Sequence, residues 1–77
     1  MFFVYVLSSQ QSKSLYKGQT EDLYKRLKAH NAGKVKSTKA YIPWKIVYYE
    51  EFNSREEAVS REKYLKSGIG RQYLKEK

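Results

Sequence analysis

Two helix-forming stretches carry polar side chains where their periodicity predicts apolar ones. In the first stretch, Leu23 and Leu27 define an inward stripe at 100° per residue; His30 falls within this stripe and Arg26 lies on its edge. Arg26 and His30 are four residues apart, so these two nitrogen-bearing side chains project toward the same place. Taken singly, each has a structural explanation: a hydrogen-bonded core histidine, and an arginine whose head reaches the surface. The pair together indicates a candidate site.

The second stretch places a carboxylate in its inward stripe. Ala58 and Leu65 mark the inward face, and by the same geometry Glu62 lies between them. Burying an unpaired carboxylate is costly, so Glu62 needs a partner. The structural explanation is a salt bridge with Lys66, four residues later, or a partly exposed position. The functional explanation is that the carboxylate binds a metal ion or acts as a general base. Both explanations stay open on the sequence alone.

Two tyrosines belong to the predicted strands that precede the first helix. Tyr5 lies in an all-apolar run, and Tyr16 stands two residues before Gly18. Tyrosine is common on β-surfaces, so neither residue alone indicates catalysis. Gly18 weakens its strand and predicts either a bulge or the close approach of another group to the backbone.

Apolar runs and helix-capping residues predict the strands and helices that must position these side chains. Apolar and β-branched runs predict strands at 2–7, 14–19 and 45–52. Thr20 as the N-cap and Gly33 after the last turn bound a first helix over about 21–32. Ser54 and Glu57 form a capping box for a second helix that ends near Lys66. A short terminal helix over roughly 70–76 follows.

The order β-β-α-β-α predicts a small α+β domain with three layers, α/β/α. The first strand is apolar on both faces, so we expect it at the centre of a three-stranded, mainly antiparallel sheet with helices on both sides. The chain has 77 residues, 40% of them hydrophobic, and no cysteine. We therefore expect a single domain, 1–77, that folds on packing alone.

The positive charge is concentrated in the middle of the chain. The net charge is +8, and residues 23–49 hold seven Lys and Arg without any acid. Within this stretch, residues 33–44 read as a loop in which lysines alternate with hydroxyl and aromatic side chains. Such a loop suits a polyanion, because it offers phosphate donors and stacking faces together. The alternative is a solvated surface that only confers solubility.

No targeting or membrane segment is predicted. The apolar start, residues 1–7, is too short for a signal-peptide core and has no basic segment before it. We therefore expect a cytoplasmic protein without membrane association.

Taken in order, these residues resemble the GIY-YIG nuclease domain, in particular its small stand-alone bacterial members related to the N-terminal domain of the UvrC excision nuclease. The motif is carried by VYV around Tyr5, YKG from Tyr16 to Gly18, and TEDLYKRLKAH with Arg26 and His30. It ends in SREEAVSREKYLK, which contains Glu62. The namesake tripeptides differ here, since Val4 and Val6 flank the first tyrosine and Lys17 replaces the middle isoleucine of the second. An asparagine found near the end of many relatives is not evident, with Gln72 as a possible substitute.

The resemblance implies a metal-dependent endonuclease that hydrolyses phosphodiester bonds in DNA, with RNA as an open alternative. It implies that Glu62 binds Mg²⁺ or Mn²⁺, that Tyr5 with Tyr16 or His30 positions or deprotonates the attacking water, and that Arg26 neutralises phosphate charge. Nucleic-acid contacts are expected at Lys17, Gly18, Lys34, Lys36, Thr38, Lys39 and Arg71. Two alternatives stay open: a nucleic-acid-binding module of the same fold without turnover, and a protein-interaction adaptor.

Overall fold

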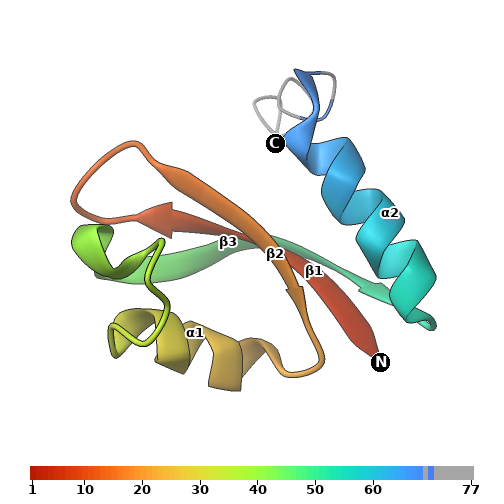
Figure 1. Ribbon diagram of the computed structural model, residues 1–77, viewed down its shortest axis with the longest axis horizontal. Helices are drawn as coiled ribbons and strands as arrows, with labels where there is room; N and C mark the ends of the chain where they lie inside the picture. The colour runs from red at the N-terminus through yellow and green to blue at the C-terminus, as the bar shows by residue number, and fades with distance from the viewer. Residues whose placement is uncertain (69, 71–77) are drawn as a thin grey trace.

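The computed structural model describes residues 1–68 and 70, and this part forms three strands and two α-helices (Figure 1). In chain order the elements are β1 (Phe2–Ser9), β2 (Leu15–Thr20), α1 (Leu23–Asn31), a 3₁₀ turn η1 (Lys39–Tyr41), β3 (Trp44–Phe52) and α2 (Arg55–Lys66). The predicted order β-β-α-β-α is confirmed. The predicted helix over 70–76 lies, apart from residue 70, outside the described residues. Neither α-helix of the described part has the length and apolar character needed to cross a membrane.

The three strands form one antiparallel sheet in the order β2-β1-β3. β1 is the central strand, as its continuous apolar run predicts, and its residues 4–7 are buried. Figure 1 shows α1 and α2 on opposite sides of this sheet, which gives the three layers. The small α+β fold expected from the sequence is therefore the observed one.

Successive residues of β1 point to opposite faces of the sheet. One set packs against α2 and the other set packs against α1. Val4 and Val6 form one buried cluster with Ala58 and Leu65 of α2. The residues between and after them face the other way, toward α1. They form a second cluster, whose buried members are Tyr5, Leu7 and Trp44. The partly buried Leu23 and Leu27 of α1 pack against it. The strand alternation thus sends Tyr5 toward the helix that carries the other candidate residues.

A bulge in β3 changes which of its side chains face α2. Leu7 pairs with Ile46 but Val6 pairs with Tyr48, so Val47 has no partner in the register. Ile46 therefore packs on the α1 side of the sheet, and Tyr48 packs on the α2 side. From the bulge onward the even-numbered residues of β3 face α2.

Both α-helices begin at a capping side chain. Ser54 caps α2 as predicted, since its Oγ accepts a hydrogen bond of 3.3 Å from the backbone N–H of Glu57. The prediction of Thr20 as the cap of α1 is wrong: Thr20 ends β2, and Asp22 is the N-cap, with its Oδ1 accepting from the backbone N–H of Lys25 at 3.0 Å. α1 is consequently two residues shorter at its start than expected.

α1 ends where the sequence predicts, at a glycine with positive φ. Gly33 has φ +76°, and its N–H donates to the carbonyl of His30 at 3.2 Å. The N–H of Lys34 donates to the carbonyl of Ala29 at 3.1 Å, which completes a Schellman motif. This turn sends the chain back along α1 instead of away from it.

The returning segment is fastened to the ends of β1 and β3. The side-chain amide of Asn31 accepts from the N–H of Trp44 at 2.6 Å and donates to its carbonyl at 3.0 Å. The indole Nε1 of Trp44 donates to the carbonyl of Thr38 at 2.8 Å, and Ser9 Oγ donates to the carbonyl of Tyr41 at 2.7 Å. The stretch expected to be a loop is therefore held in one conformation that brings Thr38 against α1.

Candidate active site

The hydroxyl of Tyr5 is the meeting point of the candidate residues. Tyr5 is 2% exposed and comes from the central strand. Its oxygen accepts a hydrogen bond from Arg26 Nε at 3.3 Å and lies 3.1 Å from His30 Nε2. Arg26 and His30 both come from α1, one turn apart, as their spacing predicts. The structure thus brings a phenol, a guanidinium and an imidazole into direct contact.

Gly18 makes room for this arrangement. It is paired directly opposite Tyr5 in the β1–β2 ladder. A Cβ built on Gly18 would lie 2.7 Å from the Tyr5 hydroxyl oxygen, closer than real Cβ contacts, and 3.1 Å from a ring carbon of Tyr16, closer than most of them. The close approach predicted from the glycine is confirmed. Gly18 is itself buried, so the expected contact between Gly18 and nucleic acid has no exposed surface to support it.

Tyr16 extends the cluster along the edge strand β2. Its ring centroid lies 4.9 Å from that of His30 and 6.3 Å from that of Tyr5. Hydrogen bonding to Tyr5, the largest effect, and to Tyr16 raises the pKa of Arg26 although burial opposes it. The two tyrosines therefore hold the guanidinium in its charged form between them.

His30 is fully buried and is contacted through both ring nitrogens. Nε2 faces the Tyr5 hydroxyl, and Nδ1 lies 2.8 Å from Thr38 Oγ1. Burial lowers the pKa of His30, and the positive charge of Arg26 lowers it further. His30 is therefore a neutral imidazole at neutral pH, which is the form that accepts a proton.

Thr38 is the main correction among the predicted residues. The sequence predicts it as a surface contact for phosphate, but the side chain is 1% exposed and its hydroxyl contacts His30. The hydroxyl also donates to the carbonyl of Val35 at 3.3 Å. Thr38 belongs to the interior of the site, and only the fold of the returning segment reveals this, because His30 and Thr38 have no helical or strand spacing in common.

Burial also sets the protonation of Tyr5. It raises the pKa of the phenol, and the hydrogen bond from Arg26 together with its positive charge offsets part of that rise. Tyr5 therefore carries its proton at neutral pH and can pass it on only to a neighbouring acceptor. His30 Nε2 is the neighbour in contact with it.

Glu62 approaches the cluster from the other layer. It lies on α2, its side chain is 19% exposed, and it forms an ion pair of 2.7 Å with Lys66. The structural explanation kept open for Glu62, a salt bridge one turn along the helix, is thus observed. The Glu62 carboxylate also raises the pKa of Tyr5 through its charge, as the smallest of the contributions. It is near enough for electrostatic coupling to Tyr5.

Oxygen and nitrogen donors for a metal are few. Within residues 1–68 and 70, no group of three or more His, Cys, Asp or Glu side chains is arranged to hold a metal ion. The candidate metal ligand remains the single carboxylate of Glu62, with Lys66 as its neighbour. A metal bound there would need water or substrate oxygens for its other positions.

The predicted phosphate-binding lysines lie on the segment that follows α1. Lys34, Lys36 and Lys39 are exposed, whereas Lys17 is half-buried on β2. Arg71 lies outside the described residues. The three exposed lysines flank the buried Thr38 in the chain, so the segment presents positive charge outward and its hydroxyl inward.

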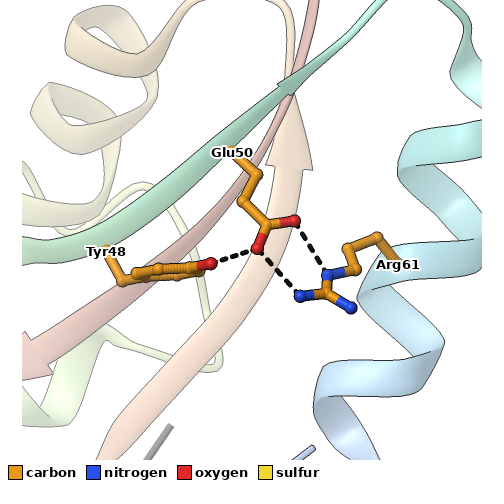
Figure 2. A network of polar contacts seen from close by, with 3 residues as sticks. All are labelled: Tyr48, Glu50 and Arg61. Atoms are coloured by element: carbon orange, nitrogen blue, oxygen red, sulfur yellow. Dashed lines mark hydrogen bonds and ion pairs between the residues drawn. The ribbon is translucent and has the colours of Figure 1, made fainter. Parts of the chain in front are cut away.

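A second polar network, not predicted from the sequence, joins β3 to α2 (Figure 2). Arg61 donates from Nε to Glu50 Oε1 at 2.8 Å and from Nη2 to Glu50 Oε2 at 3.0 Å, and Tyr48 donates its hydroxyl to the same carboxylate. Hydrogen bonding to Glu50 raises the pKa of Arg61. Arg61 precedes Glu62, so this network fixes the helical turn that carries the candidate metal ligand.

Comparison with known protein families assigns the chain to one of them. The family model described as the GIY-YIG catalytic domain matches residues 1–74. The chain therefore belongs to the GIY-YIG family, as its motifs predict.

The chain is also similar to small proteins of the UPF0213 group. A UPF0213 protein of Clostridium perfringens is 48% identical over 67 residues, which covers 86% of this chain and 71% of that protein. One from Streptococcus pyogenes is 48% identical over 65 residues, covering 83% and 70%. The solution NMR structure of a UPF0213 protein from Bacillus halodurans is similar with a TM-score of 0.56 and 35% identity, and the match covers 96% of this chain and 82% of that one.

Proposed function

We propose that this protein is a metal-dependent endonuclease that hydrolyses phosphodiester bonds in DNA. The observation that carries the proposal is the contact of the Tyr5 hydroxyl, which lies over Gly18 of the edge strand β2, with both Arg26 and His30. Hydrolysis of a phosphodiester needs a group that takes a proton from water and a positive charge beside the phosphate. One tyrosine hydroxyl here links a proton acceptor to a permanent cation.

In this proposal each residue has one task. Tyr5 holds the attacking water and accepts its proton while passing its own to His30, which is neutral because burial lowers its pKa. Arg26 neutralises charge that develops on the phosphate oxygens. Tyr16 packs against His30 and keeps Arg26 in place.

The residues present fit a divalent metal at Glu62. Mg²⁺ and Mn²⁺ prefer oxygen donors, and Mg²⁺ is commonly held by one or two carboxylates together with water and substrate phosphate. A single, partly buried carboxylate whose charge acts on Tyr5 meets that requirement once Lys66 releases it. When bound, the metal would supply Lewis-acid stabilisation of the leaving oxygen.

Backbone phosphates are the expected contact for the exposed lysines. Lys34, Lys36 and Lys39 stand on the segment whose other side touches His30, and Lys17 is one residue from Gly18. Arg71 is proposed with them on its charge alone. Such contacts bind by charge and carry no base sequence information, so the proposed nuclease selects DNA structure more than DNA sequence.

A second candidate function is nucleic-acid binding without turnover. The Glu62–Lys66 ion pair favours it, because an ammonium on the carboxylate competes with a metal ion. This candidate predicts salt-dependent DNA binding with no products at any metal concentration.

Cleavage assays separate the two. End-labelled duplex, branched and single-stranded DNA, and RNA of the same sequence, are incubated with Mg²⁺ or Mn²⁺ and wild type, Arg26→Ala or Lys25→Ala. Lys25→Ala is the matched control, since Lys25 is exposed on the same helix. The proposal expects products with wild type and Lys25→Ala, and a loss of about 100-fold or more with Arg26→Ala. Equal products from all three proteins would contradict it.

A further inference from the structure

The His30 imidazole is held between two hydroxyl groups from different parts of the chain. Nε2 lies 3.1 Å from the Tyr5 hydroxyl of β1, and Nδ1 lies 2.8 Å from Thr38 Oγ1 on the segment that follows α1. A neutral imidazole carries one hydrogen, so one nitrogen donates and the other accepts. Which nitrogen is protonated decides whether the ring can take a proton from Tyr5.

The Tyr5 contacts leave the Tyr5 hydrogen free for Nε2. The guanidinium of Arg26 has only donors, so its Nε–H uses a lone pair of the Tyr5 oxygen. The Tyr5 hydrogen cannot go back to Arg26 and is available to His30. Donation from Tyr5 to Nε2 satisfies both groups, and it requires that Nε2 carry no hydrogen.

The Thr38 contacts give the same answer at Nδ1. The Thr38 hydroxyl donates its single hydrogen to the carbonyl of Val35 at 3.3 Å. Its oxygen can then only accept from His30, which requires that Nδ1 carry the hydrogen. The two ends of the ring, argued from different neighbours, therefore agree on one tautomer.

We propose that Thr38 is a positioning residue that holds neutral His30 as the Nδ1–H tautomer, with Nε2 directed at the Tyr5 hydroxyl as its proton acceptor. The catalytic consequence rests on the proposed nuclease function. As Tyr5 takes a proton from water, its own proton moves to His30 Nε2, and the resulting imidazolium keeps its Nδ1–H bond to Thr38. The proton taken from water is thus balanced by one gained on His30.

The backbone around Thr38 is well suited to this task. Its N–H donates to the carbonyl of Val35 at 3.1 Å, and its carbonyl accepts from Trp44 Nε1 at 2.8 Å and from the N–H of Tyr41 at 3.2 Å. The hydroxyl is therefore presented by a residue that is fixed on both sides. The same segment carries the exposed Lys34, Lys36 and Lys39, so phosphate binding and orientation of the proton acceptor depend on one stretch of chain.

The test uses the fact that the chain contains one histidine. A long-range ¹H–¹⁵N NMR spectrum of the full chain at neutral pH, without nucleic acid or metal, assigns the proton to Nδ1 or Nε2 unambiguously. We expect the Nδ1–H form in the wild type. An Nε2–H form, or an imidazolium with both nitrogens protonated, would overturn the proposal without reference to any variant.

Two variants test the part assigned to Thr38. Thr38→Val keeps the shape but removes the acceptor, whereas Thr38→Ser keeps the hydroxyl. We expect a mixture of tautomers in Thr38→Val and the wild-type form in Thr38→Ser; an unchanged spectrum in Thr38→Val would overturn the positioning role. In a cleavage assay we expect Thr38→Val to be slower by about tenfold or more, with rescue in Thr38→Ser. The NMR result stands even if no cleavage is found, so failure of the nuclease proposal and failure of this one are distinguishable.

Discussion

Tyr5 lies directly opposite Gly18 in the β1–β2 ladder, and its ring occupies the space that a side chain at position 18 would need. Because the hydroxyl is brought to the edge strand in this way, it can meet Arg26 and His30 of α1. Position 18 therefore needs a glycine because a side chain there would collide with Tyr5, and not because the strand turns at this point.

Gly18→Ala should disrupt both packing and chemistry. The new Cβ would lie 2.7 Å from the Tyr5 hydroxyl oxygen, so Tyr5 must move, and we expect a loss of about 1–3 kcal/mol in the free energy of unfolding. Urea denaturation measures this. Gly68→Ala is the control, because a Cβ at Gly68 meets nothing within 4 Å. Similar stability of the two variants would contradict the steric account.

The stability of the fold should decrease as the pH falls below about 6.5. Burial, and then the charge of Arg26, lower the pKa of His30 in the folded state, so between this lowered pKa and about 6.5 the unfolded chain binds a proton that the folded chain does not. The titratable and charged groups that face His30 are Arg26 from α1, Tyr5 from β1 and Tyr16 from β2. Cleavage should decline over the lower part of the same range, as His30 becomes protonated.

An NMR titration of the single histidine checks this directly. The account predicts a midpoint below about 6.5 in the folded protein. A midpoint at or above that value would contradict the neutral acceptor assigned to His30, whatever the activity shows.

Lys66 should compete with metal for Glu62. Their ion pair of 2.7 Å involves a half-exposed ammonium, and such pairs contribute about 0.2–1 kcal/mol. We therefore expect Lys66→Met to lower the Mg²⁺ concentration for half-maximal cleavage by at most about fivefold. Lys63→Met, an exposed lysine of the same helix, is the control and should leave it unchanged. An increase in the required Mg²⁺ with Lys66→Met would argue against competition.

The Arg61–Glu50 pair should matter more for stability than the other arginine pair of α2. Arg61 and Glu50 are 27% and 22% exposed and doubly hydrogen-bonded, so Arg61→Ala should cost about 1–3 kcal/mol. Arg55 is the comparison: its 3.8 Å pair with Glu21 is exposed, and Arg55→Ala should cost less than about 1 kcal/mol. Urea denaturation of both variants measures the loss in the free energy of unfolding. Equal losses in the two variants would contradict the expected difference.

Local sequence patterns predicted much of the fold. The apolar run of β1 indicated a central strand, Gly33 marked the end of α1 and Ser54 the start of α2, and all three are confirmed. The four-residue spacing of Arg26 and His30 correctly predicted a shared location. These features depend on residues that are close together in the chain, which is why they could be predicted from the sequence.

The remaining features depend on contacts between distant residues. The bulge at Val47 depends on the pairing of β3 with β1. Because this bulge turns Glu50 toward α2, the pair between Glu50 and Arg61 could not be predicted from the sequence. Thr38 was predicted at the surface because the sequence does not show that Trp44 bonds both Thr38 and Asn31 and so holds this segment against α1.

The central claim is that this site cleaves DNA with the help of Glu62, and nicking of supercoiled circular DNA in Mn²⁺ tests it most directly. The account predicts nicked circles with wild type and with Glu56→Gln, an exposed glutamate of the same helix, but none after the metal is chelated. It predicts a loss of about 100-fold or more with Glu62→Gln. Equal nicking by wild type and Glu62→Gln would contradict it.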